Sequence, residues 1–468
     1  MSTRPSGGDL HSPSGGDLHS PSGGDLQSPS FSDLVGRMNE LLSASLTDDW
    51  PNVPVDRAEG IYFYATDGRR YMDFSSGMAT ANVGHRHPEV VEAAKQQIDR
   101  LIHGPVGVVM YEPILRLAHE LLKVVPPSLG SFFFGNSGAE AIEGCLKLAR
   151  YVTGRPGIIS FYGAFHGRTY GATSVTTSRV KYRKHYEPMV GAVYPVPFAY
   201  CYRCPYGHCR EECDLECLEG VRRLFRHVVS PDEVALILVE PIQGEGGYVI
   251  PPVEFLQGLR SLCDEHGILL AFDEVQTGFG RTGSMFAAQT FGVTPDLMAI
   301  AKGIANGFPL SATVARKDLM DRWTAGAHGT TFGGNPVSCA AALAVLRVFE
   351  KEQLVERSRR LGEMALGRLV EELGRLPGVG DVRGKGLMIG VEFVEPGSKG
   401  AAGSKGAAGS KTPDSAAVKR VLKRCLDEGL ILYPCGTDGQ VIRFIPPLVI
   451  SEDDLNRGLD ILVRAVKG

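Results

Sequence analysis

Three charged residues each stand directly after a continuous run of apolar residues. They are Glu240, Asp273 and Lys302, which follow the runs at 234–239, 268–272 and 297–301. Ligands of open α/β sheets bind beyond the carboxyl ends of the strands, so we expect the three side chains to meet at one edge of a sheet. Two acids and an amine there could carry out covalent and acid–base chemistry. Each acid could equally be a structural ion-pair partner, and the lysine a surface residue whose stem covers apolar atoms.

Lys302 is costly to place at the end of a buried strand unless its amine is used, because removing an ammonium group from water is strongly unfavourable. Desolvation lowers the pKa of a lysine and leaves a neutral amine that can attack a carbonyl carbon to form an imine. The position of Lys302 in the sequence therefore predicts a nucleophilic lysine.

Two polar segments could bind an anion. Residues 136–139, Asn-Ser-Gly-Ala, begin a segment of helical spacing, and the free N–H groups and dipole of a helix N-terminus favour negative charge. The same residues could also form an ordinary turn and N-cap. A second, glycine-rich segment at 328–336 includes Thr331, whose hydroxyl could donate to the same anion. Phe165 could cover a flat ligand, or it could pack in the core.

Pyridoxal phosphate requires a lysine that forms an imine, an acid at its pyridine nitrogen and a phosphate site. Lys302, Asp273 and residues 136–139 supply these three types. The sequence therefore predicts a pyridoxal-phosphate enzyme. A nicotinamide dehydrogenase is not supported, because no G-x-G-x-x-G turn follows the first strand.

The elements that would position these residues alternate between strands and helices. The runs at 234–239 and 268–272 are typical of strands covered on both faces, and residues 253–266 between them have helical spacing. This order predicts an α/β fold with a mostly parallel sheet. From about Asp414 onward, the order helix, strand, helix predicts a smaller second domain.

At 468 residues the chain exceeds the usual size of a single core, and we expect two domains. Residues 96–325 would form the large cofactor-binding domain, and residues 31–95 and 326–468 would form the smaller α+β domain. Two stretches of biased composition are expected to be disordered or flexible. They are an eight-residue repeat in the tail 1–30 and a Gly-Ala-Ala-Gly-Ser-Lys repeat at 397–411.

The composition argues against several classes of partner. The net charge is −4 and the isoelectric point about 6.3, so no basic field favours nucleic acid or an anionic membrane. No apolar run of ~18 residues predicts a membrane span, and the polar N-terminal residues include no signal core. We therefore expect a cytoplasmic protein that acts on small molecules.

Five of the ten cysteines crowd into residues 200–217, which we interpret as an insertion in the large domain. They are Cys201, Cys204, Cys209, Cys213 and Cys217. Such a cluster can bind zinc or an iron–sulfur group, although the spacings fit no standard pair of zinc-finger motifs. A metal site, a redox-labile or disulfide-bearing loop, and inert packing are the three alternatives.

Several longer motifs occur in one order along the chain, between about residue 53 and the C-terminus. They are Asn136-Ser-Gly-Ala-Glu-Ala141, Phe165-His-Gly-Arg-Thr169, Glu240-Pro-Ile-Gln-Gly-Glu-Gly-Gly247, Asp273-Glu-Val-Gln276, Lys302-Gly and Thr331-Phe-Gly-Gly-Asn-Pro336. With these motifs the chain resembles the class III aminotransferases, which include 4-aminobutyrate, ornithine and acetylornithine aminotransferases. The resemblance implies the pyridoxal-phosphate aminotransferase fold of type I. It also implies a homodimer with shared active sites, or a tetramer built from such dimers.

The resemblance implies specific contacts to the cofactor. Lys302 would carry it as a Schiff base and shuttle the substrate proton, while Asp273 would keep the pyridine nitrogen protonated so that the ring acts as an electron sink. Gln276 would hydrogen-bond the phenolic oxygen, and Phe165 would stack on the ring. The other implied contacts are His166, in the Phe-His-Gly motif; Ser137, Gly138 and Ala139, at the phosphate; and Thr331, at the phosphate of the neighbouring subunit.

Substrate recognition would rest on two arginines, because guanidinium groups bind carboxylates in a bidentate manner. By the same resemblance, Arg168 would bind the distal carboxylate of the donor, and Arg443 the α-carboxylate of the 2-oxoglutarate or glutamate partner. Glu240 would be a gate that pairs with Arg443 while an ω-amino donor is bound. Met78 would line a pocket wall that departs from the family's usual Gly-Gly-Ile-Ala-Val. Either arginine could instead be a surface ion-pair residue.

We therefore predict a ping-pong transaminase that moves an amino group from an ω-amino acid, such as 4-aminobutyrate, to 2-oxoglutarate or a similar keto acid. Ornithine or acetylornithine is the alternative donor. A pyridoxal-phosphate racemase or epimerase is the alternative of another reaction class, although Glu240 and Arg443 argue for a keto-acid partner. A metal-binding interaction module would account for the cysteine cluster but would leave Lys302 and Asp273 unexplained.

Overall fold

The computed structural model describes residues 30–46, 52–208, 210–397 and 411–468. Most of the predicted tail and of the predicted insertion at 397–411, together with Cys209, therefore lie outside the described residues. The chain divides into two compact units, residues 1–54 and 55–468. In the first unit the described residues form three short helical segments without buried residues: α1 (Phe31–Gly36), α2 (Met38–Leu41) and η1 (Ala44–Leu46).

A seven-stranded sheet organises the second unit, in the order β4-β10-β9-β8-β7-β5-β6. Its strands are β4 (Ser131–Gly135), β5 (Gly157–Phe161), β6 (Val193–Val196), β7 (Val234–Val239), β8 (Leu269–Asp273), β9 (Leu297–Ile300) and β10 (Ser311–Ala315). Strand β10 runs antiparallel to both its neighbours, and the pairs from β9 to β6 are parallel. Every residue of β5, β7, β8, β9 and β10 is buried. This confirms the predicted α/β fold with a mostly parallel, covered sheet.

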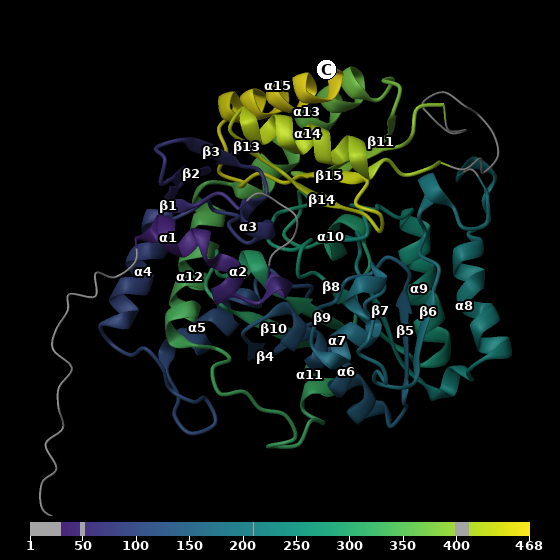
Figure 1. Cartoon of the computed structure of the whole chain (residues 1–468). Coiled ribbons are helices and arrows are strands. Elements are labelled where there is room, and N and C mark those ends of the chain that lie inside the picture. The colour runs from purple at the N-terminus through teal and green to yellow at the C-terminus, as the bar shows by residue number, and fades with distance from the viewer. Residues whose placement is uncertain (1–29, 47–51, 209, 398–410) are drawn as a thin grey trace, which may run out of the picture. The chain divides into compact units, whose positions relative to one another are not determined.

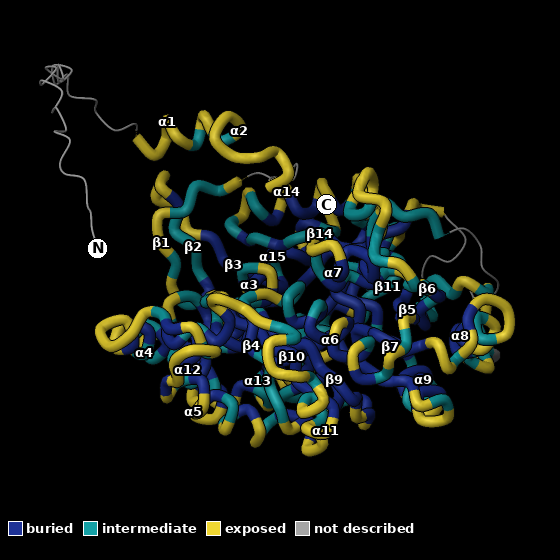
Figure 2. Tube along the Cα trace, turned by 90° about the horizontal axis from the view of Figure 1, so that it is seen from below, coloured by how far each residue is buried: buried dark blue, intermediate teal, exposed yellow. Residues whose placement is uncertain are grey.

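Helix α6 (Gly138–Thr153) follows β4 directly and contacts β4, β7, β8, β9 and β10. Its buried face, which includes Ile142 and Leu148, forms one core with Leu236 and Leu238 of β7, and Figure 2 shows this centre as buried. The other helices between residues 76 and 351 are α3 (Ser76–Ala79), α4 (Pro88–Ile98), α5 (Glu112–Leu121), α7 (Tyr170–Val175), α8 (Glu216–His227), α9 (Val253–His266), α10 (Ala287–Phe291), α11 (Lys317–Met320) and α12 (Pro336–Lys351). Short 3-10 helices are η2 (Val180–Tyr182), η3 (Cys201–Arg203), η4 (Arg210–Glu212), η5 (Pro231–Glu233) and η6 (Lys302–Ile304). Within the described ranges, no helix has the length and apolar character needed to cross a lipid bilayer.

Two four-stranded sheets form the smaller part of the second unit (Figure 1). One is antiparallel and has the order β11-β12-β15-β14, with α13, α14 and α15 beside it. The other has the order β1-β2-β3-β13, so that β13 from the C-terminal region pairs with β3 from the N-terminal region. The bounds are β1 (Val55–Glu59), β2 (Tyr62–Ala65), β3 (Arg70–Asp73), β11 (Val379–Lys385), β12 (Met388–Phe393), β13 (Leu430–Ile431), β14 (Tyr433–Cys435), β15 (Val441–Phe444), α13 (Leu354–Leu373), α14 (Ser415–Asp427) and α15 (Glu452–Lys467).

Helix α13 passes very close to the turn between β11 and β12. A Cβ atom at Gly362 would lie 2.1 Å from the carbonyl oxygen of Gly386, which is a backbone atom and cannot rotate away. The Gly362→Ala variant should therefore lose about 1–3 kcal/mol of unfolding free energy through overpacking. Scanning calorimetry of the purified protein would measure this as a lower Tm.

Gly367 on the same helix provides the matched control, because a Cβ there would meet nothing within 4 Å. The Gly367→Ala variant should keep or raise the Tm, since alanine is favoured over glycine in a helix by up to about 1 kcal/mol. Equal melting temperatures for the two variants would show that the close approach is not a constraint.

Candidate active site

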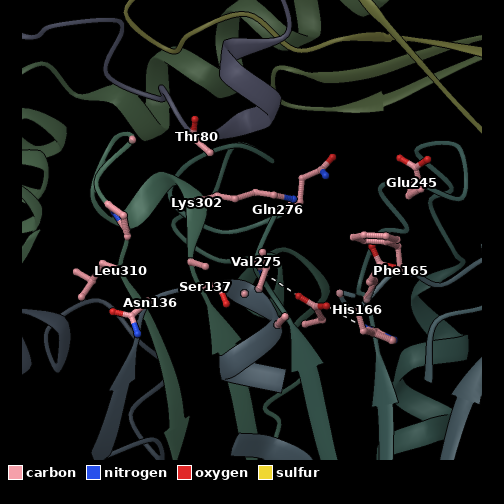
Figure 3. Close-up of a pocket in the computed structure, with 18 of the residues that line it drawn as sticks. Thr80, Asn136, Ser137, Phe165, His166, Glu245, Val275, Gln276, Lys302 and Leu310 are labelled. Carbon is pink, nitrogen blue, oxygen red and sulfur yellow. Dashed lines mark hydrogen bonds and ion pairs between the residues drawn. The ribbon is translucent and has the colours of Figure 1, made fainter. Parts of the chain in front are cut away.

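A cavity of about 400 Å³ opens at the carboxyl ends of the sheet strands (Figure 3). Most of the residues predicted to act together line it: Ser137, Gly138, Ala139, Phe165, His166, Glu240, Asp273, Gln276 and Lys302. They come from segments between residues 137 and 302 that meet because β4, β5, β7, β8 and β9 end at the same edge of the sheet. The structure thus brings the predicted amine, acids and anion site into one cavity.

Lys302 follows β9 and begins η6, and its side chain extends across the cavity toward Gln276 (Figure 3). Burial lowers the pKa of its ammonium group, whereas the charge of Asp273 acts in the opposite direction. The backbone of Lys302 has φ +48°, in the left-handed region that side chains rarely adopt. Such strain concentrates at functional sites, because the surrounding structure must hold it in place.

Asp273 ends β8 and is only 4% exposed. Its Oδ2 lies 2.7 Å from Nδ1 of His166, and its Oδ1 accepts the backbone N–H of Val275 at 3.0 Å. His166 therefore donates from Nδ1, because a carboxylate only accepts. These two contacts orient the Asp273 carboxylate at the wall of the cavity.

The anion site is the N-terminus of α6, which begins at Gly138. Ser137 is the N-cap, and its hydroxyl accepts the N–H of Glu140 at 3.3 Å. The first N–H groups of a helix have no partner within it, and here they border the cavity. A Cβ at Gly138 would lie 2.8 Å from Cγ1 of Val275, so glycine permits this close packing of the helix end.

Glu240 does not pair with Arg443, and our prediction of that contact was wrong. Its Oε1 accepts the N–H of Phe165 at 2.9 Å, and its Oε2 accepts the N–H of Gly244 at 2.9 Å. Glu240 is buried, and this burial raises the pKa of its carboxyl. Because Glu240 directly follows β7, its side chain stays at the sheet edge, where it joins the loop of Phe165 to the loop that follows β7.

Arg443 instead forms an ion pair with Glu245, through Nη2 and Oε2. Glu245 lines the cavity. Arg443 is only 5% exposed and is not among the described residues that line the cavity. Two hydrogen bonds to the carbonyl oxygen of Pro434, from Nε at 3.2 Å and from Nη2 at 3.0 Å, fix the guanidinium from another side. The Tyr182 hydroxyl donates to Oε1 of Glu245 at 3.1 Å.

Three other predicted residues are not part of the described lining. Arg168 is exposed beside the cavity, with its guanidinium carbon 4.8 Å from the ring centroid of Tyr182 and 5.9 Å from that of Phe165. Thr331 is exposed, and Met78 is 41% exposed with φ +63°. In a single subunit, Thr331 and Met78 are therefore outside the described lining of the cavity, and Arg168 lies at its side.

The cysteine-rich insertion packs against β12. Tyr200 donates a hydrogen bond to the buried Glu392, and Nε of Arg203 lies 2.5 Å from Oε1 of the same carboxylate. The described cysteines of the insertion, Cys201, Cys204, Cys213 and Cys217, are free thiols. Among the residues that the structure describes, which exclude Cys209, no three Cys, His, Asp or Glu side chains are grouped to hold a metal ion. The described residues therefore do not support a metal site as the explanation of the cysteine cluster.

A family model described as aminotransferase class-III matches residues 44–466. The chain belongs to the class III aminotransferase family. It is 40% identical to a probable 4-aminobutyrate aminotransferase of Bacillus subtilis, over 88% of this chain and 92% of that protein. It is also 39% identical to an alanine/serine racemase of Pyrococcus horikoshii, over 93% of this chain and 90% of that protein.

Solved structures of other aminotransferases have a similar fold. The fold is similar to that of a taurine:2-oxoglutarate aminotransferase from Bifidobacterium kashiwanohense in complex with PLP and glutamate, with a TM-score of 0.83 and 29% identity. That likeness covers 94% of this chain and 98% of the other. Class III aminotransferases depend on pyridoxal phosphate, so this chain is a pyridoxal-phosphate-dependent transaminase of that family.

The residues of the cavity fit this cofactor. The α6 N-terminus offers N–H groups to a phosphate, Asp273 offers a carboxylate to a pyridine N–H, and Lys302 offers an amine to an aldehyde. The buried Oε1 of Gln276 has no hydrogen-bond partner within the described ranges, so its amide is available to a ligand in the cavity. The types of donor and acceptor match those that pyridoxal phosphate requires.

The sequence analysis missed Glu245 and the two residues beside it. Tyr182 and Arg179 lie at η2, in a segment with neither a glycine-rich motif nor clear periodicity, so no local signal distinguished them from surface residues. Glu245 lies in the same motif as Glu240, and the motif alone does not show which glutamate faces Arg443. The presence of two glutamates in that motif was the signal that Arg443 had two candidate partners.

The Glu240→Gln variant tests the corrected role of Glu240. An amide nitrogen would face one of the two backbone N–H donors, and leaving that donor unpaired should cost about 1–3 kcal/mol of unfolding free energy. We expect a lower Tm. The relative rates with different amino donors, and those with different keto acids, should be unchanged. A shift of those relative rates without a change in Tm would restore the gate role to Glu240.

Proposed function

We propose that this enzyme transfers the amino group of an ω-amino acid, such as 4-aminobutyrate, to 2-oxoglutarate or a similar keto acid in a ping-pong reaction. The observation that carries the proposal is the buried Arg443 covered by Glu245. An ω-amino donor brings no α-carboxylate to the reacting carbon, so Arg443 then needs Glu245 as its counter-ion. A keto acid brings an α-carboxylate, which can replace Glu245 on the same guanidinium.

We assign the cofactor contacts to residues that line the cavity. Lys302 would bind the cofactor covalently and move the proton at the substrate carbon. Asp273, oriented by His166, would hold the proton on the pyridine nitrogen, and Gln276 would hydrogen-bond the phenolic oxygen. Ser137, Gly138 and Ala139 would bind the phosphate, and Phe165 would lie against the ring. Pyridoxal phosphate itself supplies an electron sink for the pair left when the substrate C–H bond breaks.

The position of Arg168 supports a role in donor recognition. Its guanidinium carbon lies 4.8 Å from the ring centroid of Tyr182, and the Tyr182 ring packs against Phe165, which lines the cavity. Arg168 would bind the distal carboxylate of the donor, while the amino group reaches Lys302. Met78 would contribute to the wall near this end of the substrate.

We also infer a homodimer in which Thr331 reaches the phosphate bound in the neighbouring subunit. Thr331 adjoins Phe332, which is 60% exposed, and the Phe332 ring lies 5.1 Å from that of His103. Ile102, next to His103, is 62% exposed. Exposed apolar side chains grouped in this way are typical of surfaces covered by a second subunit.

The Lys302→Ala variant tests the assignment of the nucleophile. Borohydride should fix the cofactor to the wild-type protein but not to the variant, because the amine that forms the imine is gone. Turnover should fall by roughly a thousandfold or more, since general acid–base catalysis at the same position is also lost. Lys317→Ala, which removes an exposed lysine on α11, should change neither result. Normal turnover by Lys302→Ala would refute the assignment.

The donor class can be tested with the two half-reactions in separate single turnovers. We expect 4-aminobutyrate alone to convert the visible absorption of the bound cofactor to that of its amino form, and 2-oxoglutarate to restore it. The rival activity is racemisation, which is the activity named for the Pyrococcus horikoshii relative. Loss of optical rotation from an α-amino acid without any keto acid, and no reaction with ω-amino acids, would establish the racemase instead.

A further inference from the structure

The Glu245 carboxylate lies between two arginines. Its Oε2 pairs with Nη2 of Arg443, and its Oε1 lies 3.5 Å from Nε of Arg179. The Tyr182 hydroxyl donates to the same Oε1 at 3.1 Å. One oxygen of this carboxylate therefore faces the buried arginine, and the other faces a second cation with a hydroxyl beside it.

Arg179 is held in place independently of Glu245. Its Nη2 donates to the carbonyl oxygen of Gly436 at 2.9 Å, whereas Arg443 donates to the carbonyl oxygen of Pro434. Both guanidinium groups are thus anchored on one short backbone segment, and the backbone N–H of Gly436 donates to the carbonyl oxygen of Glu245 at 2.8 Å. The two arginines have fixed positions on either side of a side chain that can rotate.

Nε of Arg179 is also an unused donor. It is buried and has no hydrogen-bond partner in the described part of the chain, because 3.5 Å is too long for a good hydrogen bond to Oε1. A small rotation of Glu245 toward Arg179 would complete that bond. Glu245 is therefore paired with Arg443, and Arg179 is placed to become its second ion-pair partner.

Displacement of Glu245 from Arg443 creates a physical difficulty. The Glu245 side chain is only 13% exposed, and a carboxylate that loses its counter-ion at low exposure is strongly destabilised. The incoming substrate carboxylate also repels it. Without a second cation nearby, Glu245 would compete strongly with the substrate for Arg443.

We propose that Arg179, together with the Tyr182 hydroxyl, is the second binding position for Glu245, which it occupies while a substrate α-carboxylate is on Arg443. This rests on the proposed function, in which Arg443 binds the keto acid. Arg179 is then a positioning residue that determines specificity, because it sets how easily Arg443 becomes available. Burial and the Glu245 charge raise the pKa of Tyr182, so its hydroxyl keeps the proton that it donates to Glu245.

The test measures the binding of glutarate, an unreactive dicarboxylate, to the holoenzyme by calorimetry. Arg179→Gln should raise the Kd by about tenfold or more, the effect of removing a charge-assisted hydrogen bond from the state in which Glu245 is displaced. Arg179→Lys, which keeps the charge, should recover most of the affinity. Lys184→Gln removes an exposed positive charge from the same segment and should have no effect.

A double variant separates the proposal from its alternatives. In the Glu245→Gln background there is no carboxylate to relocate, so adding Arg179→Gln should change the Kd for glutarate by less than about twofold. The full tenfold loss in that background would mean that Arg179 binds the substrate directly, and would overturn the proposal. An unchanged Kd for Arg179→Gln in the wild-type background would overturn it as well.

The reaction of each variant with 4-aminobutyrate gives a second readout. The Arg179→Gln enzyme should keep the wild-type rate in this half-reaction, because Glu245 stays on Arg443 throughout. An equal loss in both half-reactions would indicate a merely structural role and would contradict the proposal. If the wild-type enzyme does not react with any ω-amino acid, the proposed function fails, while the glutarate titrations still decide the role of Arg179.

Discussion

Desolvation at the carboxyl edge of the seven-stranded sheet is the constraint on which the site depends. Glu240, Asp273 and Lys302 lie there because buried strands end at or just before them. A buried ion is strongly unfavourable without a partner. Backbone N–H groups serve Glu240, and His166 serves Asp273. For Lys302, burial favours the neutral amine, which is also its nucleophilic form.

The same constraint applies to substrate recognition, but there the two charged groups come from different parts of the fold. Arg443 lies on β15 of the smaller antiparallel sheet, whereas Glu245 follows β7 of the large sheet. Their ion pair therefore spans the two parts of the second unit. A cation and an anion contributed by separate parts can exchange partners without disturbing the covered strands that hold Lys302 and Asp273.

The cysteine-rich insertion is connected to this region through buried charges. Arg203 contacts Oε1 of Glu392, and Tyr200 contacts Oε2, which also lies 2.7 Å from Nη1 of Arg383. Nε of Arg383 in turn donates to the carbonyl oxygens of Gly247 and Tyr248, in the loop that carries Glu245. The insertion thus helps to complete a network that fixes the loop, which gives it a packing role whatever the state of its cysteines.

The sequence by itself determined the fold class and the groups around Lys302, because apolar runs and a helix N-terminus are local patterns. It also indicated Arg443, through the resemblance to the class III aminotransferases. It assigned the wrong glutamate to Arg443, since Glu240 and Glu245 lie in one motif and Arg443 is 198 residues beyond the second. Only the tertiary structure decided that pairing and added Arg179 beside it. Contacts between residues so far apart depend on how loops fold over the end of the sheet, and no local pattern encodes that path.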